Sequence, residues 1–343
     1  MAINQWPMSF KARAVCWFFV SRLFYVWCRM SSMVSGREHL NVIWESQELL
    51  AYLHPSPWTP GVAVVTHKTS GSTSSLFHLP EDAFVCLLLG ARTVARLLCE
   101  KLDVRRCALV HTPHARAGSL GVELFVIPLH GVTELWKPHV AAEEDFQPYD
   151  PGYISSKSGP RWTDSCLEEI KNHIRARLPV PNTALNYTYL GEASDRELFP
   201  RIVRGEEKQW RVWEDDSHIA VLTPFPNTPG LTVLIPRKPL SSDILRLEAA
   251  DYKELVLATR QVSRLLEAGL DAWGVGLIFE GFEIDYAHAK LIPLVSSPDK
   301  AVLSLTCPAS DFTQLYPGYV TSVYGPPANI ESLQEFCSKI THR

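Results

Sequence analysis

Two long stretches of the sequence repeat one another, and this repetition constrains the possible folds more than any other feature. Residues 42–61 read VIWESQELLAYLHPSPWTPG, and residues 211–230 read RVWEDDSHIAVLTPFPNTPG. Further matched blocks follow in the same order at nearly constant spacing, and the last pair is PGYISSKSGP from Pro151 and PGYVTSVYGP from Pro317. Several matched blocks at one period are the signature of a duplicated structural unit. The sequence therefore predicts two tandem domains.

The predicted domains cover residues 33–180 and 190–343, and a polar, proline-containing stretch from Pro179 to Glu192 joins them. A length of 343 residues agrees with two domains, because single hydrophobic cores stop growing at about 250–300 residues. The apolar fraction of 46% is that of an ordinary globular protein. A net charge of −4 gives no general attraction for a polyanion, so we expect no nucleic-acid partner.

Each predicted domain shows the same order of strands and helices. Short apolar runs between Pro and Gly turns predict antiparallel strands, and one longer segment has apolar residues at helical spacing. This order favours an α+β fold, in which each domain has an antiparallel sheet with a long helix packed on it. In the second domain we expect strands at 211–213, 218–222 and 231–235, a helix from Asp251 to Leu266, a strand ending at Pro293 and a tail helix at 330–340. In the first domain we expect a helix at 82–98, a strand ending at Pro128 and a tail helix at 163–177.

Residues 1–31 form a separate basic and aromatic segment. No acidic residue occurs before Glu38, and Arg22 and Arg29 lie seven residues apart on one face of a possible helix. This composition is typical of a mitochondrial targeting sequence. A helix on a membrane surface and a helix that covers the core of the first domain are the alternatives. The apolar run 14–20 is too short to span a bilayer, so we expect no transmembrane segment.

The eight cysteines are scattered along the chain, with no C-x-x-C pair and no zinc-ligand spacing. Such scattered cysteines predict free thiols in a reducing intracellular compartment, which could be mitochondrial or cytoplasmic. No metal site and no cofactor is expected.

The segment 281–293, GFEIDYAHAKLIP, carries the strongest candidate chemistry. A loop at Glu280–Gly281 is expected to lead into a short strand that ends at Pro293, on which Tyr286, His288 and Lys290 share one face. An imidazole beside a cation suits attack on phosphorus, because the cation attracts phosphate and disfavours protonation of the imidazole. The alternative is a half-buried histidine whose hydrogen bonds are only structural.

The order of these motifs resembles the histidine triad (HIT) superfamily of nucleotide hydrolases and transferases. The resemblance covers nearly all of the second domain and, in weaker form, the first. HIT proteins carry H-x-H-x-H on the strand before I-x-P. Counting back from Pro293 puts His288 at the middle position, Tyr286 at the first and Lys290 at the third. Tyr286 departs from the family pattern, and so does Pro239, which stands where the family usually has a histidine.

The resemblance implies a nucleotide hydrolase or nucleotidyl transferase in which His288 attacks an α-phosphate and forms a nucleotidyl-histidine intermediate. The small-molecule substrate would be a dinucleoside polyphosphate such as a diadenosine polyphosphate, an adenylate or a nucleoside phosphoramidate. Lys290 would stabilise the charge on the phosphate, and Tyr286 would replace an orienting partner. The alternative is a catalytically inactive nucleotide-binding or scaffold protein, which Tyr286 and Pro239 favour.

Four other residues of the second domain are candidates for substrate binding. Arg237 and Lys238 follow a predicted strand and could reach phosphate, although basic residues at a strand end are usually solvated. Glu280 and Gly281 precede the candidate catalytic strand, where relatives place polar groups near the leaving side of the substrate. A simple turn explains Gly281 equally well.

In the first domain the position of His288 is taken by Glu123, flanked by Gly121 and Phe125. A carboxylate repels phosphate and offers no imidazole, so this domain is expected to be inactive. The PGY blocks occur in both domains and are expected to be structural clasps. HIT proteins commonly form two-fold dimers, so the resemblance also implies an internal pseudo-dimer and a monomeric chain.

Overall fold

The computed structural model describes residues 40–69, 75–114, 119, 121–180, 184–298 and 311–342. From Val42 onward the chain forms one unit, whose N-terminal half (42–180) and C-terminal half (184–342) are described below. The expectations for residues 1–31 fall outside the described residues. None of the helices in the described ranges is both long enough and apolar enough to cross a membrane.

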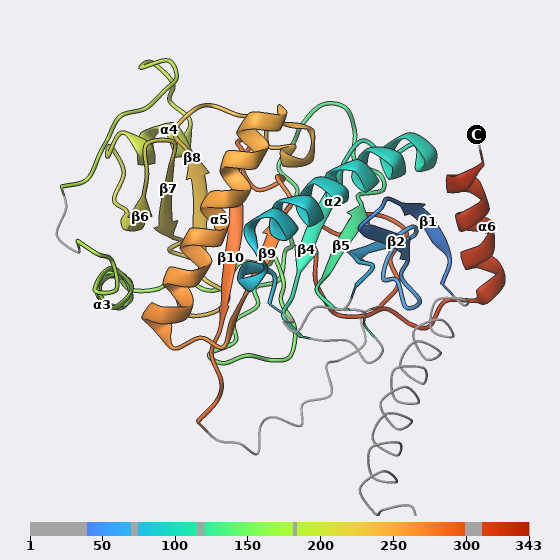
Figure 1. Ribbon diagram of the computed structural model, residues 1–343. Helices are drawn as coiled ribbons and strands as arrows, with labels where there is room; N and C mark the ends of the chain where they lie inside the picture. Colours follow the sequence, from blue (N-terminus) through green and yellow to red (C-terminus); the bar gives the residue numbers. More distant parts are fainter. Residues whose placement is uncertain are drawn as a thin grey trace, which may run out of the picture. The chain divides into compact units, whose positions relative to one another are not determined.

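A single antiparallel sheet runs through this unit (Figure 1). Within the described residues it has ten strands in the order β1-β2-β3-β5-β4-β9-β10-β8-β7-β6. Counted inward from each edge, the two halves follow the same pattern, β1-β2-β3-β5-β4 in one and β6-β7-β8-β10-β9 in the other. The halves meet where β4 pairs with β9. The strands are β1 Val42–Glu45, β2 Leu49–Leu53, β3 Ala63–His67, β4 Cys107–His111, β5 Glu123–Pro128, β6 Trp210–Glu214, β7 His218–Leu222, β8 Thr232–Pro236, β9 Gly274–Phe279 and β10 Ala289–Leu294.

Two long helices, α2 (Glu81–Leu102) and α5 (Ala249–Leu270), cover one face of this sheet (Figure 1). Their apolar residues point to the sheet, and Phe84 on α2 and Leu255 on α5 are completely buried. Burial of each such side chain contributes about 1.5–3 kcal/mol to stability. Both helices end at an aspartate in the left-handed conformation, at Asp103 and Asp271. The predicted α+β fold with long helices on an antiparallel sheet is confirmed, although both helices extend beyond the predicted ends.

The last helix of each half packs against the other half. Helix α3 (Asp164–Arg175) contacts α5 and β6, whereas α6 (Ile330–Thr341) contacts α2 and β1 (Figure 1). A glycine on α5, Gly269, allows the close approach of α3, since a Cβ there would lie 2.8 Å from the Cα of Ile174. The tail helices are therefore exchanged between the halves.

The two PGY segments are also exchanged. We call residues 151–160 the first clasp and residues 317–326 the second clasp. The clasps pair with each other through an isolated bridge between Ser155 and Thr321. Each then lies against a loop of the opposite half, where Gly159 N–H donates to the Phe225 carbonyl (3.1 Å) and Gly325 N–H donates to the Ser56 carbonyl (3.0 Å). The first clasp thus reaches the C-terminal half at the loop that follows β7.

Candidate active site

A cavity of about 340 Å³ opens in the C-terminal half between β10, the loop after β7, and the short helix α4 (Leu198–Val203). The sheet and α4 supply most of its apolar wall, and the first clasp contributes to its polar end. The apolar wall includes Leu198, Phe199, Ile202, Trp210, Val221 and Phe225, and the polar residues include Lys157, Ser158, Glu283, His288 and Lys290.

His288 reaches this cavity from the residue directly before β10. Its Nδ1 lies 2.7 Å from the Tyr286 carbonyl oxygen, which can only accept, so Nδ1 carries a proton in this hydrogen bond. The lone pair of the neutral ring is then on Nε2. The Phe199 ring packs edge-on against the imidazole, with centroids 5.3 Å apart. These contacts fix the orientation of a ring whose Nε2 is basic.

The strand expected between the Glu280–Gly281 loop and Pro293 starts later in the structure. β10 begins only at Ala289, because residues 283–286 form bends and Tyr286 N–H donates to the Ile284 carbonyl. Tyr286 therefore does not line the cavity beside His288, and its hydroxyl donates to the Pro236 carbonyl at 2.9 Å. Its ring still packs on Phe199, which also contacts His288. The expectation that Tyr286 lies on the strand was wrong, because this residue belongs to the bends before β10.

Lys290 lies on β10 and lines the same cavity as His288. Its ammonium group is 2.8 Å from the Glu283 carboxylate and donates to the Ser156 carbonyl of the first clasp at 2.8 Å. An ammonium group has three donors, so one N–H remains for a phosphate oxygen. The nearby Lys290 also holds the pKa of the Glu283 carboxyl below its usual value.

The pKa of His288 is lowered from its ordinary value of 6.5. Burial is the main cause, and the positive charge of Lys290 lowers it further, whereas the Tyr286 carbonyl and Glu283 act in the opposite direction. The imidazole is therefore neutral at pH 7, as a nucleophile must be.

This pKa gives an expected pH dependence. If His288 is a nucleophile, only its neutral form can attack. Its pKa lies below 6.5, so kcat/KM should stay at its plateau as the pH falls through 6.5 and decline only below that. Lys290→Gln removes the nearby cation and should move the acidic limb to higher pH. A pH profile of kcat/KM for both proteins measures this, and an unchanged acidic limb in the variant would contradict it.

The predicted substrate-binding residues Glu280 and Gly281 lie outside the cavity lining. Glu280 accepts a hydrogen bond from the Tyr316 hydroxyl at 2.5 Å, and burial raises the pKa of its carboxyl. Gly281 has φ +84°, and a Cβ there would lie 2.3 Å from the Ser242 carbonyl oxygen. Gly281 therefore adopts a left-handed conformation close to Ser242 that only glycine fits.

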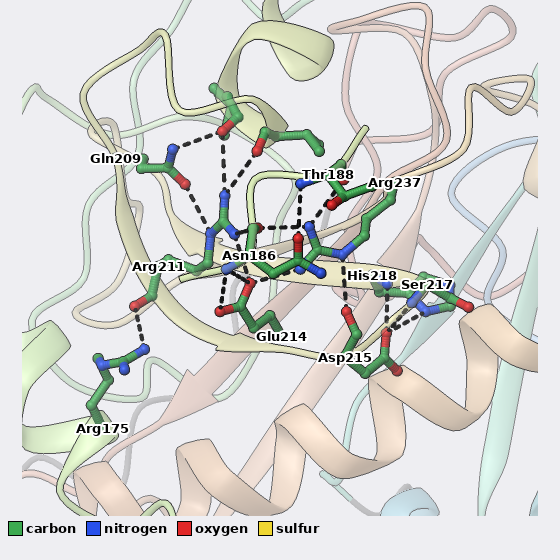
Figure 2. A network of polar contacts seen from close by, with 12 residues as sticks. Arg175, Asn186, Thr188, Gln209, Arg211, Glu214, Asp215, Ser217, His218 and Arg237 are labelled. Carbon is green, nitrogen blue, oxygen red and sulfur yellow. Dashed lines mark hydrogen bonds and ion pairs between the residues drawn. The ribbon is translucent and has the colours of Figure 1, made fainter. Parts of the chain in front are cut away.

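Arg237 is fully buried and is not among the residues that line the cavity. Figure 2 shows Arg237 within a network of polar contacts. Its guanidinium donates to Glu214 Oε2 at 2.6 Å and to the backbone carbonyls of Asn186, Thr188 and Asp215. Arg211 is buried beside it and shares the same Glu214 oxygen at 2.7 Å. The prediction that Arg237 reaches phosphate does not fit these contacts, because its donors anchor the segment that joins the two halves.

Lys238, the other basic candidate, lies at the surface and is also absent from the cavity lining. Its ammonium group is 3.0 Å from both carboxylate oxygens of Asp251 at the start of α5. Lys238 and Asp251 thus form a surface ion pair at a helix N-terminus, where a carboxylate is favoured.

In the N-terminal half, the corresponding space is filled. Glu123 begins β5, is buried, and accepts a hydrogen bond from the Tyr52 hydroxyl at 2.8 Å. Phe125 lies where Lys290 lies in the other half, and it packs against Trp58 and Tyr324 with centroids 6.0 and 6.4 Å apart. These rings occupy the space that is a polar cavity beside His288.

The sequence reasoning missed Lys157, Ser158, Phe199 and Glu283, which all line the cavity. Lys157 and Ser158 belong to the first clasp, and their part in this cavity depends on the exchange of the clasps. No group of three or more His, Cys, Asp or Glu in the described ranges could hold a metal ion. The cysteines in those ranges, Cys86, Cys99, Cys107, Cys166 and Cys337, are free thiols.

No family model matches this chain. The chain is 26% identical over 128 residues to an uncharacterised HIT-like protein of Saccharolobus solfataricus, a match that covers 36% of this chain and 91% of that protein. The resemblance to the HIT superfamily is confirmed by this similarity.

Two solved structures are also similar. A HIT-like protein of Bartonella henselae involved in cell-cycle regulation is 20% identical, with a TM-score of 0.28, over 43% of this chain and 95% of that chain. An ADP-glucose phosphorylase of Arabidopsis thaliana is 10% identical, with a TM-score of 0.42, over 84% of this chain and 81% of that chain.

Proposed function

We propose that the C-terminal half is a HIT-type nucleotide hydrolase or nucleotidyl transferase in which His288 is the nucleophile. The observation that carries this proposal is the state of His288 within the cavity. Its Nδ1 is tied to the Tyr286 carbonyl, its pKa is lowered and Lys290 lies in the same cavity. A rigidly held neutral imidazole next to a cation has what attack on a phosphate group requires.

The reaction follows from this geometry. The Nε2 lone pair of His288 forms a bond to the α-phosphorus while the bond from phosphorus to the leaving oxygen or nitrogen breaks. The leaving group takes that electron pair, and a nitrogen leaving group also takes a proton from solvent and departs as the amine. Lys290 stabilises the negative charge on the phosphate oxygens. Water or another hydroxyl acceptor then attacks the phosphorus of the nucleotidyl-histidine and loses its proton to solvent. The bond between phosphorus and Nε2 breaks, and its electron pair returns to Nε2.

The size and lining of the cavity fit a nucleotide. A volume of about 340 Å³ lies within the usual range of about 300–1,000 Å³ for small-ligand sites. Trp210 and Phe225 are aromatic residues of the apolar wall, and Phe225 is 45% exposed. A base would lie against this wall, and its α-phosphate would lie at the polar end near His288 and Lys290.

We also propose that the two halves are duplicated domains that form an internal pseudo-dimer. The mirrored strand order, the pairing of β4 with β9 and the exchanged tail helices support this arrangement. The N-terminal half carries Glu123 in place of the nucleophile, so one chain would hold one active site and would be monomeric.

A labelling experiment tests the proposed function. The protein is incubated with diadenosine tetraphosphate and with adenosine 5′-phosphoramidate, both labelled in the α-phosphate, and is then quenched in alkali. We expect label on the protein that is stable in alkali, lost in acid and absent from His288→Asn, as a phosphoramidate bond to histidine requires. Turnover without any such adduct in rapid-quench samples would contradict the mechanism.

A scaffold protein remains the second candidate, because the Tyr286 hydroxyl is bonded to the Pro236 carbonyl and not to the ring of His288. Tyr286→His distinguishes the two candidates. If the protein is an enzyme, the parent should turn over nucleotide, and the variant should differ from it by less than about tenfold, since the Tyr286 carbonyl that orients His288 is retained. An inert parent with an active variant would establish the scaffold.

A further inference from the structure

We propose that Lys157, which the inactive N-terminal half contributes, recognises a phosphate of the leaving group and selects substrates that carry one. This inference rests on the proposed function, because it assigns the part of the substrate beyond the α-phosphate. It names the substrate class as nucleotides with a phosphate-bearing leaving group, in preference to phosphoramidates.

The backbone of Lys157 holds this residue near the end of the cavity where His288 and Lys290 lie. The ammonium group of Lys290 donates to the Ser156 carbonyl at 2.8 Å, and that carbonyl belongs to the peptide bond that leads into Lys157. Both lysines line the cavity together with His288. A phosphate bound at Lys290 would therefore have a second cation nearby, on the side formed by the first clasp.

The Lys157 side chain is held in place. Only 16% of it is exposed, and its Nζ lies 4.3 Å from the centroid of the Tyr319 ring in the second clasp. Its backbone N–H donates to Ser155 Oγ at 3.2 Å. A cation over an aromatic face is stabilised and loses little further freedom when it binds an anion.

The carboxylate of Glu143, which pairs with Lys157, is easily displaced by another anion. Nζ lies 3.2 Å from Glu143, whose side chain is 84% exposed. Exposed ion pairs contribute little to stability, so a polyphosphate with more negative charge can replace this carboxylate. The apolar wall is then left for the base, and Lys157 for the phosphate beyond the reacting phosphorus.

The other half of the chain provides the substitution for a test. The second clasp has Val323 where the first clasp has Lys157, in PGYVTSVYGP and PGYISSKSGP. Lys157→Val therefore introduces a residue that the same backbone accepts elsewhere in this protein. Lys171→Ala is the matched control, because it also removes one positive charge, from α3 outside the cavity.

The two substrates of the labelling experiment separate the roles. For diadenosine tetraphosphate, whose leaving group is ATP, Lys157→Val should lower kcat/KM about ten- to hundredfold, mainly through KM. For adenosine 5′-phosphoramidate, whose leaving group is ammonia, kcat/KM should change less than about threefold. Lys171→Ala should leave both unchanged. An equal loss with both substrates, or no loss with either, would overturn the role of Lys157.

Binding measurements keep this test independent of turnover. In the unreactive His288→Asn protein, ADP should bind more tightly than AMP, and adding Lys157→Val should abolish that preference. If the parent turns over neither substrate but this preference is present and lost with Lys157, the proposed enzyme fails while the phosphate site stands. If ADP and AMP bind equally with Lys157 intact, the phosphate site is wrong even in an active enzyme.

Discussion

His288→Asn should lower nucleotidyl transfer by roughly four orders of magnitude or more, as expected when a covalent nucleophile is removed. Asn can still donate a hydrogen bond to the Tyr286 carbonyl, and it is smaller than the imidazole, so the strand and cavity should remain. Nucleotide affinity should therefore change only a few-fold. Single-turnover rates and equilibrium binding of AMP measure the two quantities separately.

Glu123→Gln is the matched control, because Glu123 lies as many residues before Pro128 as His288 lies before Pro293. Its amide oxygen can still accept the hydrogen bond of Tyr52, and nucleotidyl transfer should be unchanged. A His288→Asn protein that keeps its rate, or a Glu123→Gln protein that loses it, would mean that the nucleophile has been assigned to the wrong half.

Glu214→Gln should destabilise the protein by about 3–5 kcal/mol, as loss of one partner from a buried ion pair typically does. Two completely buried guanidinium groups, those of Arg211 and Arg237, share Glu214 Oε2 (Figure 2). The neutral amide keeps the shape of the side chain but leaves both positive charges without their counter-ion. Urea denaturation followed by tryptophan fluorescence measures the change in unfolding free energy.

The control for this change is Lys238→Ala, next to Arg237 in sequence. It breaks only the exposed pair with Asp251 and should cost less than about 1 kcal/mol. Similar losses in the two variants would argue against a special role for the buried network. Glu214→Gln should also weaken activity, since the anchored segment leads into α4, and α4 carries the Phe199 ring that packs on His288.

The sequence predicted the elements that depend on local pattern. Helical spacing between Tyr252 and Leu266 located α5, because one buried face of a helix leaves a periodic signal. Counting from Pro293 identified His288 and Lys290, which the structure brings into one cavity.

Contacts between distant segments could not be predicted in this way. Arg237 looked like a solvated cation at a strand end, and its burial depends on Glu214 and on the carbonyls of a distant connecting segment. Lys157 entered the cavity only through the exchange of the clasps. The delayed start of β10 follows from a local bend before Ala287, which alternation of side chains does not reveal.

The pairing of β4 with β9 means that neither half is dispensable, even though only one has the candidate nucleophile. Removal of residues 42–180 would expose the backbone groups of a fully buried strand, Gly274–Phe279, as an open edge of the kind that recruits other chains into aggregates. The deletion would also remove α3, the helix that packs on β6. A substitution at Glu123 would therefore leave the sheet intact, whereas a deletion of the N-terminal half would not, so the packing of that half matters whether or not it carries any chemistry.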